Sequence, residues 1–500
     1  MGKGRLLIRA DANVAMGTGH VMRCLALAQA WQDAGGNATF AMAQPSAWAG
    51  ERLSRESTEV LEISGSAGSE EDAEQTAVLA GENAADWIVV DGYQFAANYQ
   101  RTLKAAGFKT LFLDDYGHCE SYCADFVLNQ NASADEAAYR NREAHTRLLL
   151  GPQYCLLRRE FNAWREWRRE IAPAAHRVLV TMGGADPENF TGRALQALNS
   201  MAVNELEAVV VVGGSNMHSA ALQPLAGAGK RITLRRDVLN MAELMAWADL
   251  AVSAAGTTCW EMCLMGLPAL LIDLAANQTA VARELDRRGC AIRLGSSIDV
   301  SSEKIMERAE PLLKSVGDRQ AMSRRCRELV DGKGAARVVS ALSNTSLHLR
   351  PAQEEDARLL WEWANDPQVR AASFSSAPIP WSTHAAWFAE RRRENHLRIW
   401  IAEDDWGTPV GQIRFDQHAG GDAEIDISVA RELRGQGLGV ELIRQAMQSL
   451  WSATSCVRLH AFVKPENVVS VKAFEKGGFR RVGMGEVQGN EAVHLIYEAT

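Results

Sequence analysis

Two successive stretches of alternating strand and helix patterns constrain the fold of this chain more than any other feature. The first stretch has predicted strands at Arg5–Arg9, Ala38–Ala43, Trp87–Val90 and Thr110–Leu113, with helical patterns such as Val21–Ala34 and Tyr99–Ala106. The second stretch restarts the alternation, with predicted strands at Arg177–Thr181, Glu207–Val212, Ile232–Arg235, Leu250–Val252 and Ala269–Ile272. Such alternation predicts parallel sheets covered by helices on both faces. We therefore predict two Rossmann-like α/β domains, residues 1–160 and 161–343, joined by a connecting helix over Arg158–Pro173.

A third domain is predicted over residues 347–500, where the composition changes. Seven tryptophans fall between residues 361 and 451. Its predicted strands are Arg398–Glu403, Pro409–Asp416, Glu424–Val429, Val457–Val463 and Ala492–Tyr497, with helices at Gly437–Trp451 and Val468–Gly477. A chain of 500 residues is long enough for three domains at about 100–200 residues each.

Charge and composition exclude some classes of protein. A net charge of −9 and an isoelectric point near 5.8 argue against a dedicated nucleic-acid binder. We find no signal segment and no apolar run of the roughly 20 residues that span a bilayer, so we predict a cytoplasmic protein that does not enter a membrane. The nine cysteines are scattered. They are predicted to be reduced and mostly buried, and no metal site is expected.

The first candidate site lies where the first strand leads into the first helix. Gly17 and Gly19 let the backbone approach a ligand closely, and the N-terminus of the helix that carries Arg23 attracts anions. His20 stands at the carboxyl ends of the strands, where open α/β sheets bind ligands. His20 is predicted to be a general base, since its ordinary pKa lies near neutral pH; a helix-capping role is the alternative.

The second domain supplies a matching set of turns. Gly183 and Gly184 follow one predicted strand, and Gly256, Thr257 and Thr258 follow another and can offer donors to a diphosphate. Glu261 lies one turn into the next helix, where it can accept from a ribose diol. Asn277 and Gln278 offer amides suited to sugar hydroxyl or acetamido groups. Each glycine turn alone is more often an ordinary loop, but the combination in two consecutive Rossmann-like halves favours a nucleotide-sugar cleft.

Residues 1–343 resemble the UDP-2,4-diacetamido-2,4,6-trideoxy-β-L-altropyranose hydrolases of pseudaminic acid biosynthesis, and more distantly the GT-B glycosyltransferases of the peptidoglycan type. The resemblance rests on Asp11, the Gly17–Arg23 segment, Asp91-Gly-Tyr93, Asp114-Asp115, Gly151–Tyr154, Gly183-Gly184, Gly256–Thr258, Glu261 and Asn277-Gln278. It implies that His20 activates a water molecule, that this water attacks the anomeric carbon with inversion of its configuration, and that UDP leaves. It also implies a substrate site containing Tyr93 and Arg23, sugar- or water-positioning roles for Asn277 and Asp11, no obligatory metal and a link to flagellin glycosylation.

The second candidate site is a glycine-rich turn in the third domain. A strand with alternating polarity ends at Val429 and is followed by Arg434, Gly435, Gln436, Gly437, Leu438 and Gly439, and then by a helix. Closely spaced glycines present successive N–H groups to a pyrophosphate, and the helix dipole adds to the attraction. The spacing fits neither the Walker A motif nor the Rossmann fingerprint.

With the segment Asn467–Phe479, this turn resembles the GCN5-related N-acetyltransferases. The resemblance implies acetyl-CoA as co-substrate. Ile427 and Val429 would pair with its pantetheine arm, Arg434 to Gly439 would hold its pyrophosphate, and Asn467 would face it. The segments containing Asn365, Arg370 and Trp387 resemble the branch that acetylates sugar nucleotides, which implies that they bind the amino sugar.

One residue departs from this family pattern. Many relatives have a tyrosine, the acid for the leaving thiolate, where this chain has Phe474. Tyr497, a water or the solvent would then protonate the thiolate. Glu424 and Asp426 are candidate bases acting through water, or simply solvated strand residues.

The sequence therefore favours a bifunctional enzyme of pseudaminic acid biosynthesis. The third domain would acetylate the 4-amine of UDP-4-amino-4,6-dideoxy-N-acetyl-β-L-altrosamine, and the first two would hydrolyse the acetylated UDP-sugar. A glycosyltransferase fused to an acetyltransferase, and a non-catalytic nucleotide-sugar-binding module that regulates the acetyltransferase, are the alternatives. The stereochemistry of the sugar (altro or legionaminic type), the oligomeric state and any partnership with other enzymes of the pathway are left open.

Overall fold

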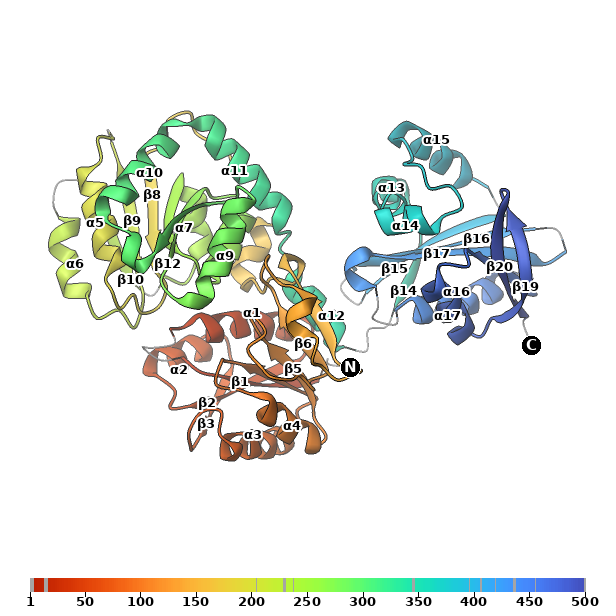
Figure 1. The fold of residues 1–500 in the computed structure, drawn as a ribbon, viewed down its shortest axis with the longest axis horizontal. Coiled ribbons are helices and arrows are strands. Elements are labelled where there is room, and N and C mark those ends of the chain that lie inside the picture. The colour runs from red at the N-terminus through yellow and green to blue at the C-terminus, as the bar shows by residue number, and fades with distance from the viewer. Residues whose placement is uncertain are drawn as a thin grey trace. The chain divides into compact units, whose positions relative to one another are not determined.

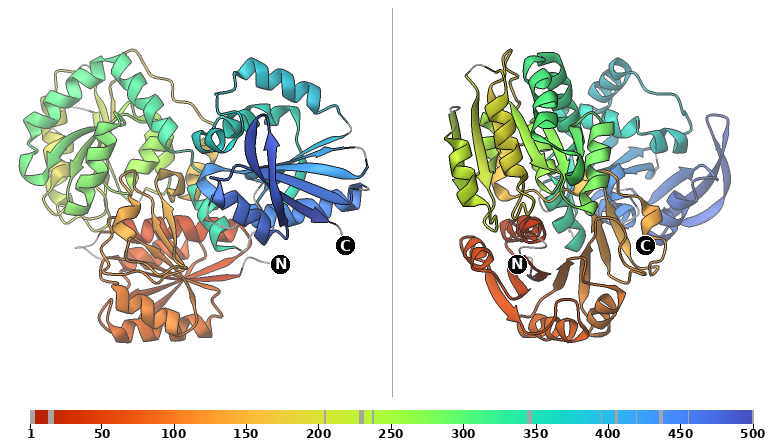
Figure 2. Two further views of the ribbon diagram at one scale, coloured as in Figure 1. Left: turned by 45° about the vertical axis from the view of Figure 1, so that its right-hand side comes forward. Right: turned by 60° about the vertical axis from the view of Figure 1, so that its left-hand side comes forward.

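The computed structural model describes residues 4–12, 17–203, 205–227, 231–236, 238–343, 347–394, 396–404, 407–418, 420–434, 438–454 and 456–498. It divides into two compact units, Met1–Val339 and Ser340–Thr500. Among the described helices, none has both the length and the apolar character needed to cross a bilayer. Both units are α/β structures with sheets at their centres (Figures 1 and 2).

The first unit begins with a seven-stranded parallel sheet in the order β3-β2-β1-β4-β5-β6-β7. Its strands are β1 (Arg5–Ala10), β2 (Asn37–Ala43), β3 (Glu59–Ile63), β4 (Trp87–Asp91), β5 (Lys109–Leu113), β6 (Phe126–Asn129) and β7 (Arg147–Leu150). Its helices are α1 (Gly19–Asp33), α2 (Ala47–Ser54), α3 (Glu70–Glu82) and α4 (Ala97–Ala105). Helices α3 and α4 cover one face of the sheet and α1 covers the other (Figure 1).

A second parallel sheet follows in the same unit, in the order β10-β9-β8-β11-β12-β13. Its strands are β8 (Arg177–Thr181), β9 (Glu207–Val212), β10 (Arg231–Arg236), β11 (Leu250–Ala254), β12 (Ala269–Asp273) and β13 (Ile292–Ser296). Its helices are α5 (Phe190–Ser200), α6 (Ser219–Ala226), α7 (Met241–Trp247), α8 (Thr258–Met265), α9 (Ala276–Arg287), α10 (Ser302–Lys314) and α11 (Val316–Leu329). Helix α12 (Gly334–Leu342) follows and begins against the backbone of Tyr154 and Cys155.

The two sheets share one topology, and this topology fixes where a ligand can bind. In each, the first strand lies between the second and the fourth, so the chain moves outward to one side and then returns to the other. Loops diverge at this switch point and leave a crevice at the carboxyl ends of the strands. The predicted Rossmann-like α/β class is confirmed.

The connection between the two sheets differs from the helix that we predicted over Arg158–Pro173. The structure has only a short 3-10 helix at Arg159–Trp164, followed by irregular chain. Of residues 159–173 only Phe161 is buried, so little of this segment packs against a core. Helices in proteins depend mainly on such packing for their stability. Leu157 and Phe161 pack into the core of the second sheet.

The second unit contains a seven-stranded sheet in the order β14-β15-β16-β17-β18-β20-β19. Its strands are β14 (His348–Pro351), β15 (Leu397–Glu403), β16 (Pro409–Gln417), β17 (Asp422–Val429), β18 (Arg458–Val463), β19 (Arg480–Val487) and β20 (Asn490–Glu498). Its helices are α13 (Ala357–Ala364), α14 (Pro367–Ala372), α15 (Trp381–Arg391), α16 (Leu438–Ala453) and α17 (Val468–Lys476). Helices α16 and α17 pack on one face of the sheet, and α13 to α15 lie on the other (Figure 1).

The middle of this sheet opens between two neighbouring strands. Strands β17 and β18 are parallel and pair over only three positions, from Asp422 with Arg458 to Glu424 with His460. Beyond these pairs β17 continues to Val429 and β18 to Val463, and the described residues show no further pairing between them. The facing edges therefore leave backbone groups that an extended amide-bearing ligand can pair with.

Candidate functional site

A cavity of about 370 Å³ lies in the first unit and is lined by loops from both of its sheets. Its lining residues follow β1, β4, β5, β8, β9, β11 and β12, so it occupies the carboxyl ends of both sets of strands. The cavity brings together predicted site residues from far apart in the sequence: Gly17, Gly19, His20, Arg23, Tyr93, Gly183, Gly184, Gly256, Thr257, Thr258, Glu261, Asn277 and Gln278. It therefore joins the two candidate sets of turns into one site.

His20, at the start of α1, is held by a carboxylate from the end of β4. Its Nδ1 lies 2.7 Å from Oδ1 of Asp91. Asp91 is fully buried, and although burial raises its pKa, the charges of Arg23 and His20 hold the pKa well below its usual range. An ionised carboxylate only accepts hydrogen bonds, so Nδ1 of His20 carries the hydrogen. The other nitrogen, Nε2, is then the basic one, and His20 lines the cavity.

Arg23 links this pair to a second carboxylate. Its guanidinium donates to both oxygens of Asp91 at 2.7 Å and to Oδ1 of Asp115 at 2.8 Å. Asn131 also donates to Asp115, at 2.9 Å. Burial raises the pKa of Asp115, but the Arg23 charge and hydrogen bond lower it more strongly. The buried Arg23 is thus paired with the buried Asp91 and the half-buried Asp115, which makes the network rigid.

Tyr93 connects the network to the second sheet. Its hydroxyl donates to Oδ2 of Asp115 at 2.6 Å and accepts from Nδ2 of Asn277, at the start of α9, at 2.7 Å. Burial and the Asp115 charge raise the pKa of Tyr93 far above its ordinary value, so it stays a neutral phenol. The ring of Tyr93 meets the His20 ring edge-on at 5.0 Å between centroids. Tyr93 and Asn277 therefore form a polar bridge across the cavity.

The opposite wall of the cavity is a helix N-terminus. Thr257 precedes α8 and its side chain makes no capping hydrogen bond, while the N–H groups of Cys259 and Trp260 in the first turn bond to the carbonyl oxygens of Gly256 and Thr257. The partial positive charge at the start of the helix and the Thr257 and Thr258 hydroxyls favour an anion here. One turn further, Oε1 of Glu261 accepts from Nε and Nη2 of Arg158, at 2.9 and 2.8 Å. The Gln278 side chain bonds within its own loop, since its Oε1 accepts from the backbone N–H of Leu274 at 2.9 Å.

Glycines bring the two lobes into close approach at the mouth of the cavity. A Cβ atom added to Gly184 would lie 2.8 Å from Oγ1 and 2.9 Å from Cγ2 of Thr18. Gly17 and Gly183 have φ values of +76° and +78°, a conformation that favours glycine. These positions explain why the two turns contain glycine.

We predict that Gly184→Val weakens UDP binding by about tenfold, because a side chain against Thr18 forces the lobes apart at a cost of about 1–3 kcal/mol. Isothermal titration with UDP measures this change. Gly81→Ala is the matched control, since a Cβ atom at Gly81 in α3 meets nothing within 4 Å. Equal affinity in wild type and Gly184→Val would contradict the proposed approach of the lobes.

The structure does not place Asp11 among the predicted site residues that line the cavity. Its Oδ1 accepts from the backbone of Ala43 at 2.8 Å and pairs with Nη1 of Arg9 at 2.7 Å, while Oδ2 accepts from Gln94 at 3.2 Å. Asp11 is buried and is not among the residues that line the cavity. Its contacts give it a structural role, which is to neutralise the fully buried Arg9.

Three residues behind Tyr93 have the side-chain types of metal ligands. Ligand atoms of Asp114, His118 and Cys119 lie within 4.8 Å of one another. Nδ1 of His118 lies 3.1 Å from Asp114, and Nε2 lies 3.2 Å from the carbonyl oxygen of Phe95. Burial lowers the pKa of His118, but its hydrogen bonds and the Asp114 charge raise it to about 10. The His118 ring also lies edge-on to the Tyr93 ring, with 5.7 Å between centroids, so the group packs directly beside Tyr93.

Several residues of the site were not predicted from the sequence as site residues. Asp91, Asp115, Asn131, Arg158 and Trp48 all join the network or line the cavity. Asp91 is the last residue of a fully buried strand, and Asp115 follows the neighbouring strand. A carboxylate at the carboxyl end of a central parallel strand is the signal that would have identified both.

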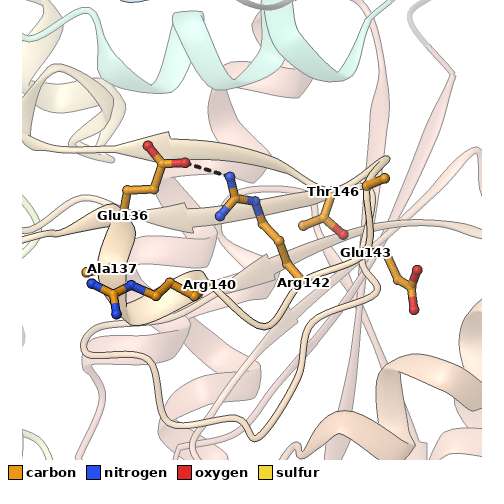
Figure 3. Close-up of a pocket in the computed structure, with 7 residues that line it drawn as sticks. Glu136, Ala137, Arg140, Arg142, Glu143 and Thr146 are labelled. Atoms are coloured by element: carbon orange, nitrogen blue, oxygen red, sulfur yellow. Dashed lines mark hydrogen bonds and ion pairs between the residues drawn. The ribbon is translucent and has the colours of Figure 1, made fainter.

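A separate, more open hollow of about 630 Å³ lies near the end of the first sheet (Figure 3). It is lined by Glu136, Ala137, Arg140, Arg142, Glu143, Ala144 and Thr146. Arg142 is already paired with Glu136 at 2.6 Å. None of the predicted site residues lines this hollow.

In the second unit, the predicted cofactor residues lie around the open middle of the sheet. Ile427 and Val429 are on β17 beyond its pairing with β18, and Leu438 and Gly439 begin α16. Gly435, Gln436 and Gly437 lie outside the described residues. Arg434 is paired with Asp366 at 2.8 Å and donates to the carbonyl oxygen of Val429 at 2.9 Å.

Asn467 caps the next helix, since its Oδ1 accepts from the backbone N–H of Ser470 at 3.2 Å. Arg434 and Asn467 are thus anchored by the protein itself at the two sides of the opening. Their side chains are held in place before any ligand binds.

The residues predicted to hold the amino sugar are mostly engaged with the backbone. Asn365 donates to the carbonyl oxygen and accepts from the N–H of Ile379, and Arg370 donates to the carbonyl oxygens of Ala364 and Ser375. Trp387 is half-buried, with the guanidinium of Arg414 5.8 Å from its ring centroid. Asn365 and Arg370 therefore shape the loop after α14, while Trp387 packs beside His384 and Arg414.

Comparisons with known proteins divide the chain into the same two units as the structure. Residues 177–337 match the glycosyltransferase family 28 C-terminal domain, and residues 346–480 match the acetyltransferase (GNAT) domain. An uncharacterized protein of Methanocaldococcus jannaschii is 22% identical, over 98% of this chain and 99% of its own length.

Other relatives match one unit each. The UDP-2,4-diacetamido-2,4,6-trideoxy-beta-L-altropyranose hydrolase of Campylobacter jejuni is 25% identical, over 57% of this chain and 97% of its own. Aminoglycoside N(6')-acetyltransferase type 1 of Klebsiella pneumoniae is 25% identical, over 31% of this chain and 84% of its own. A solved structure of the aminoglycoside acetyltransferase AAC(6')-Ib with coenzyme A is 21% identical, covers 31% of this chain and 95% of its own, and has a TM-score of 0.27. The chain is therefore a fusion of a GT-B-like, glycosyltransferase-related unit with a GNAT acetyltransferase domain.

Proposed function

We propose that the chain performs two consecutive reactions of pseudaminic acid biosynthesis. The second unit acetylates the 4-amine of UDP-4-amino-4,6-dideoxy-N-acetyl-β-L-altrosamine with acetyl-CoA. The first unit hydrolyses the product, UDP-2,4-diacetamido-2,4,6-trideoxy-β-L-altropyranose, to the free sugar and UDP. The observation that carries the second step is the His20–Asp91 pair, whose His20 lines the same cavity as the N-terminus of α8. The relative from Campylobacter jejuni supports the choice of sugar.

The hydrolysis follows from the arrangement of charges in the cavity. Nε2 of His20 takes a proton from water while the water oxygen bonds to the anomeric carbon and the bond to the diphosphate breaks. The resulting imidazolium is stabilised by Asp91, which stays ionised. The charge on the leaving UDP is met by the partial positive charge at the start of α8 and by the Thr257 and Thr258 hydroxyls. Tyr93 and Asn277 face the sugar from the other side of the cavity.

The acetylation follows from the open sheet of the second unit. The free backbone edge of β17 pairs with the pantetheine arm, and the start of α16 receives the pyrophosphate. The relative that acetylates aminoglycosides supports an amino sugar as acceptor. Both substrates, a UDP-sugar and acetyl-CoA, favour the cytoplasm as the site of action.

A sequential assay tests the proposal. The full chain is incubated with the UDP-amino sugar and acetyl-CoA, and CoA, UDP and sugar are followed by mass detection. We expect CoA to appear first and UDP second, with diacetamido sugar as the final product. Without acetyl-CoA, UDP release should be slower by at least about tenfold, because the cavity then lacks the acetamido group that Asn277 and its neighbours hold. Equal UDP release with and without acetyl-CoA would contradict the order.

A glycosyltransferase is the second candidate for the first unit. It is favoured by the match of residues 177–337 to a glycosyltransferase family. In that case UDP would appear only when a hydroxyl acceptor is added. The acceptor-free assay above separates the two functions, because a hydrolase needs only water.

A further inference from the structure

Helix α14 is fastened to the ends of both strands that separate in the sheet of the second unit. At its start, Oδ1 of Asp366 accepts from Nη1 of Arg434 at 2.8 Å. Arg434 follows β17, and its Nε donates to the carbonyl oxygen of Val429, the last residue of that strand, at 2.9 Å. At the other end, the carbonyl oxygen of Ala371 accepts from Nζ of Lys464, the residue after β18, at 3.0 Å. One short helix thus links both strand ends.

The attachment at the start of α14 is a charged pair that also caps the helix. Oδ1 of Asp366 accepts from the backbone N–H groups of Gln368 and Val369, at 3.0 and 3.2 Å. The side chain of Gln368 adds a second acceptor for Nη1 of Arg434, at 2.9 Å. Burial raises the pKa of Asp366, but the bonds to Arg434 and to the helix N–H groups lower it more strongly, so the carboxylate stays ionised. The side chain of Arg434 is therefore committed to this attachment.

The two attachments lie on opposite sides of the opening between β17 and β18. The strands run parallel and pair last at Glu424 and His460, so their carboxyl ends border the open part. Helix α14 lies with α13 and α15, on the face opposite α16 and α17 (Figure 1). Burial lowers the pKa of Arg370, in the middle of α14, and the nearby charge of Asp426, on the unpaired part of β17, opposes that shift. The helix therefore crosses the opening on this face of the sheet.

The position of α14 depends on these contacts rather than on the helix itself. With six residues, α14 is too short to be stable without support from its surroundings. Arg370 ties it to the carbonyl oxygens of Ala364 before it and Ser375 after it. Asn365 bonds to both the N–H and the carbonyl oxygen of Ile379 and so closes the following loop. These bonds hold the helix to its own segment, and only the two attachments described above fix it over the strands.

We propose that α14 is a strap that holds the pantetheine arm of acetyl-CoA in the opening, with Asp366 and Lys464 as the positioning residues that fasten it. This inference rests on the acetyl-CoA-dependent function proposed above. The unpaired strand edges bind the amide groups of the arm. Since α16 and α17 cover the other face of the sheet, an arm under α14 is enclosed from both sides. The diphosphate is held separately, at the start of α16, so the strap acts on the arm alone.

Two ligands separate the strap from the rest of the cofactor site. CoA contains the arm, and 3′-phosphoadenosine 5′-diphosphate is the same nucleotide without it. In Asp366→Asn, asparagine still caps α14 but no longer carries the charge that binds Arg434. Titration calorimetry of the full chain should show CoA binding weakened about fivefold, the effect of about one lost hydrogen bond. Binding of 3′-phosphoadenosine 5′-diphosphate should stay at the wild-type level.

The second attachment is tested in the same way. Lys464→Met keeps the length of the side chain but loses the donor to Ala371, and it should weaken CoA binding about threefold without affecting the shorter ligand. Lys464→Arg keeps a donor and should restore wild-type affinity. Glu362→Gln is the control, because Glu362 is an exposed residue of α13 that pairs with Arg358 on its own helix. It should leave the binding of both ligands unchanged.

The comparison of ligands distinguishes the strap from other roles of these residues. A loss of general surface charge or of folded protein weakens both ligands alike, so equal losses in Asp366→Asn and Lys464→Met would overturn the strap. Wild-type affinity for CoA in both variants would overturn it as well. A wild-type chain that binds neither ligand would contradict the acetyl-CoA-dependent function itself, and the strap with it.

Discussion

Replacing His20 with alanine should reduce UDP release by about a thousandfold or more and leave CoA release unchanged. General bases contribute about 10²–10⁴-fold to such reactions, and Nε2 of His20 is the free basic nitrogen of the His20–Asp91 pair. The acetyl-transfer site belongs to the other compact unit, with its own sheet and core, so it should not be affected. Both products are measured in one incubation by mass detection.

His145→Ala is the matched control for this variant, because His145 is an exposed histidine of the same unit. It should leave both activities at wild-type levels. Loss of both activities in His20→Ala, with an unchanged melting temperature, would contradict two separate sites. Full UDP release in His20→Ala would exclude His20 as the base.

Replacing Asp91 with asparagine should have an effect of similar size for a different reason. Asparagine keeps the shape but not the charge, so Nδ1 of His20 no longer has an ionised acceptor and the imidazolium loses its counter-ion. Arg23 also loses one of its two carboxylate partners in the buried network. We expect a fall in UDP release of about a thousandfold and a loss of stability of about 3 kcal/mol, as for other broken buried ion pairs.

The stability that Asp91→Asn loses should depend on pH in a definite direction. The pKa of Asp91 is lowered in the folded protein, so its contribution is present above the ordinary aspartate pKa of about 3.9 and is lost as the pH falls toward the folded value. The difference in unfolding free energy between wild type and Asp91→Asn should therefore be largest near neutral pH and shrink in acid. Urea unfolding at pH 7 and pH 3.5 measures it. An equal difference at both values would contradict the ionised state of Asp91.

Much of the fold could be predicted from the sequence because its strands are fully buried and strongly apolar. Strand β8 was predicted at its observed bounds, as was β9. Strand β3 was missed because it is half-exposed and carries two glutamates, Glu59 and Glu62. The connecting helix was wrong because most of residues 159–173 are half-buried or exposed, and too little of the segment packs on a core to hold it helical.

The turns that line the cavity could be predicted from the sequence, whereas the partners of the paired side chains could not. Glycine and threonine turns at the ends of strands are visible in a sequence, and they line the cavity. The partners of His20 and of Arg434 lie 71 and 68 residues away, respectively, and no local pattern joins them. The roles of Asn365 and Arg370 do not follow from the sequence alone, because the same side chains that suit a sugar also suit a loop backbone.

Hydrolysis in ¹⁸O-labelled water tests the central claim most directly. The full chain is given UDP-2,4-diacetamido-2,4,6-trideoxy-β-L-altropyranose in H₂¹⁸O without any acceptor, and both products are weighed by mass spectrometry. If His20 directs water to the anomeric carbon, the label appears in the free sugar at early times and UDP contains none. Label in UDP would mean that water attacks phosphorus, and no UDP without an added acceptor would mean that the unit is a transferase; either result would contradict the account.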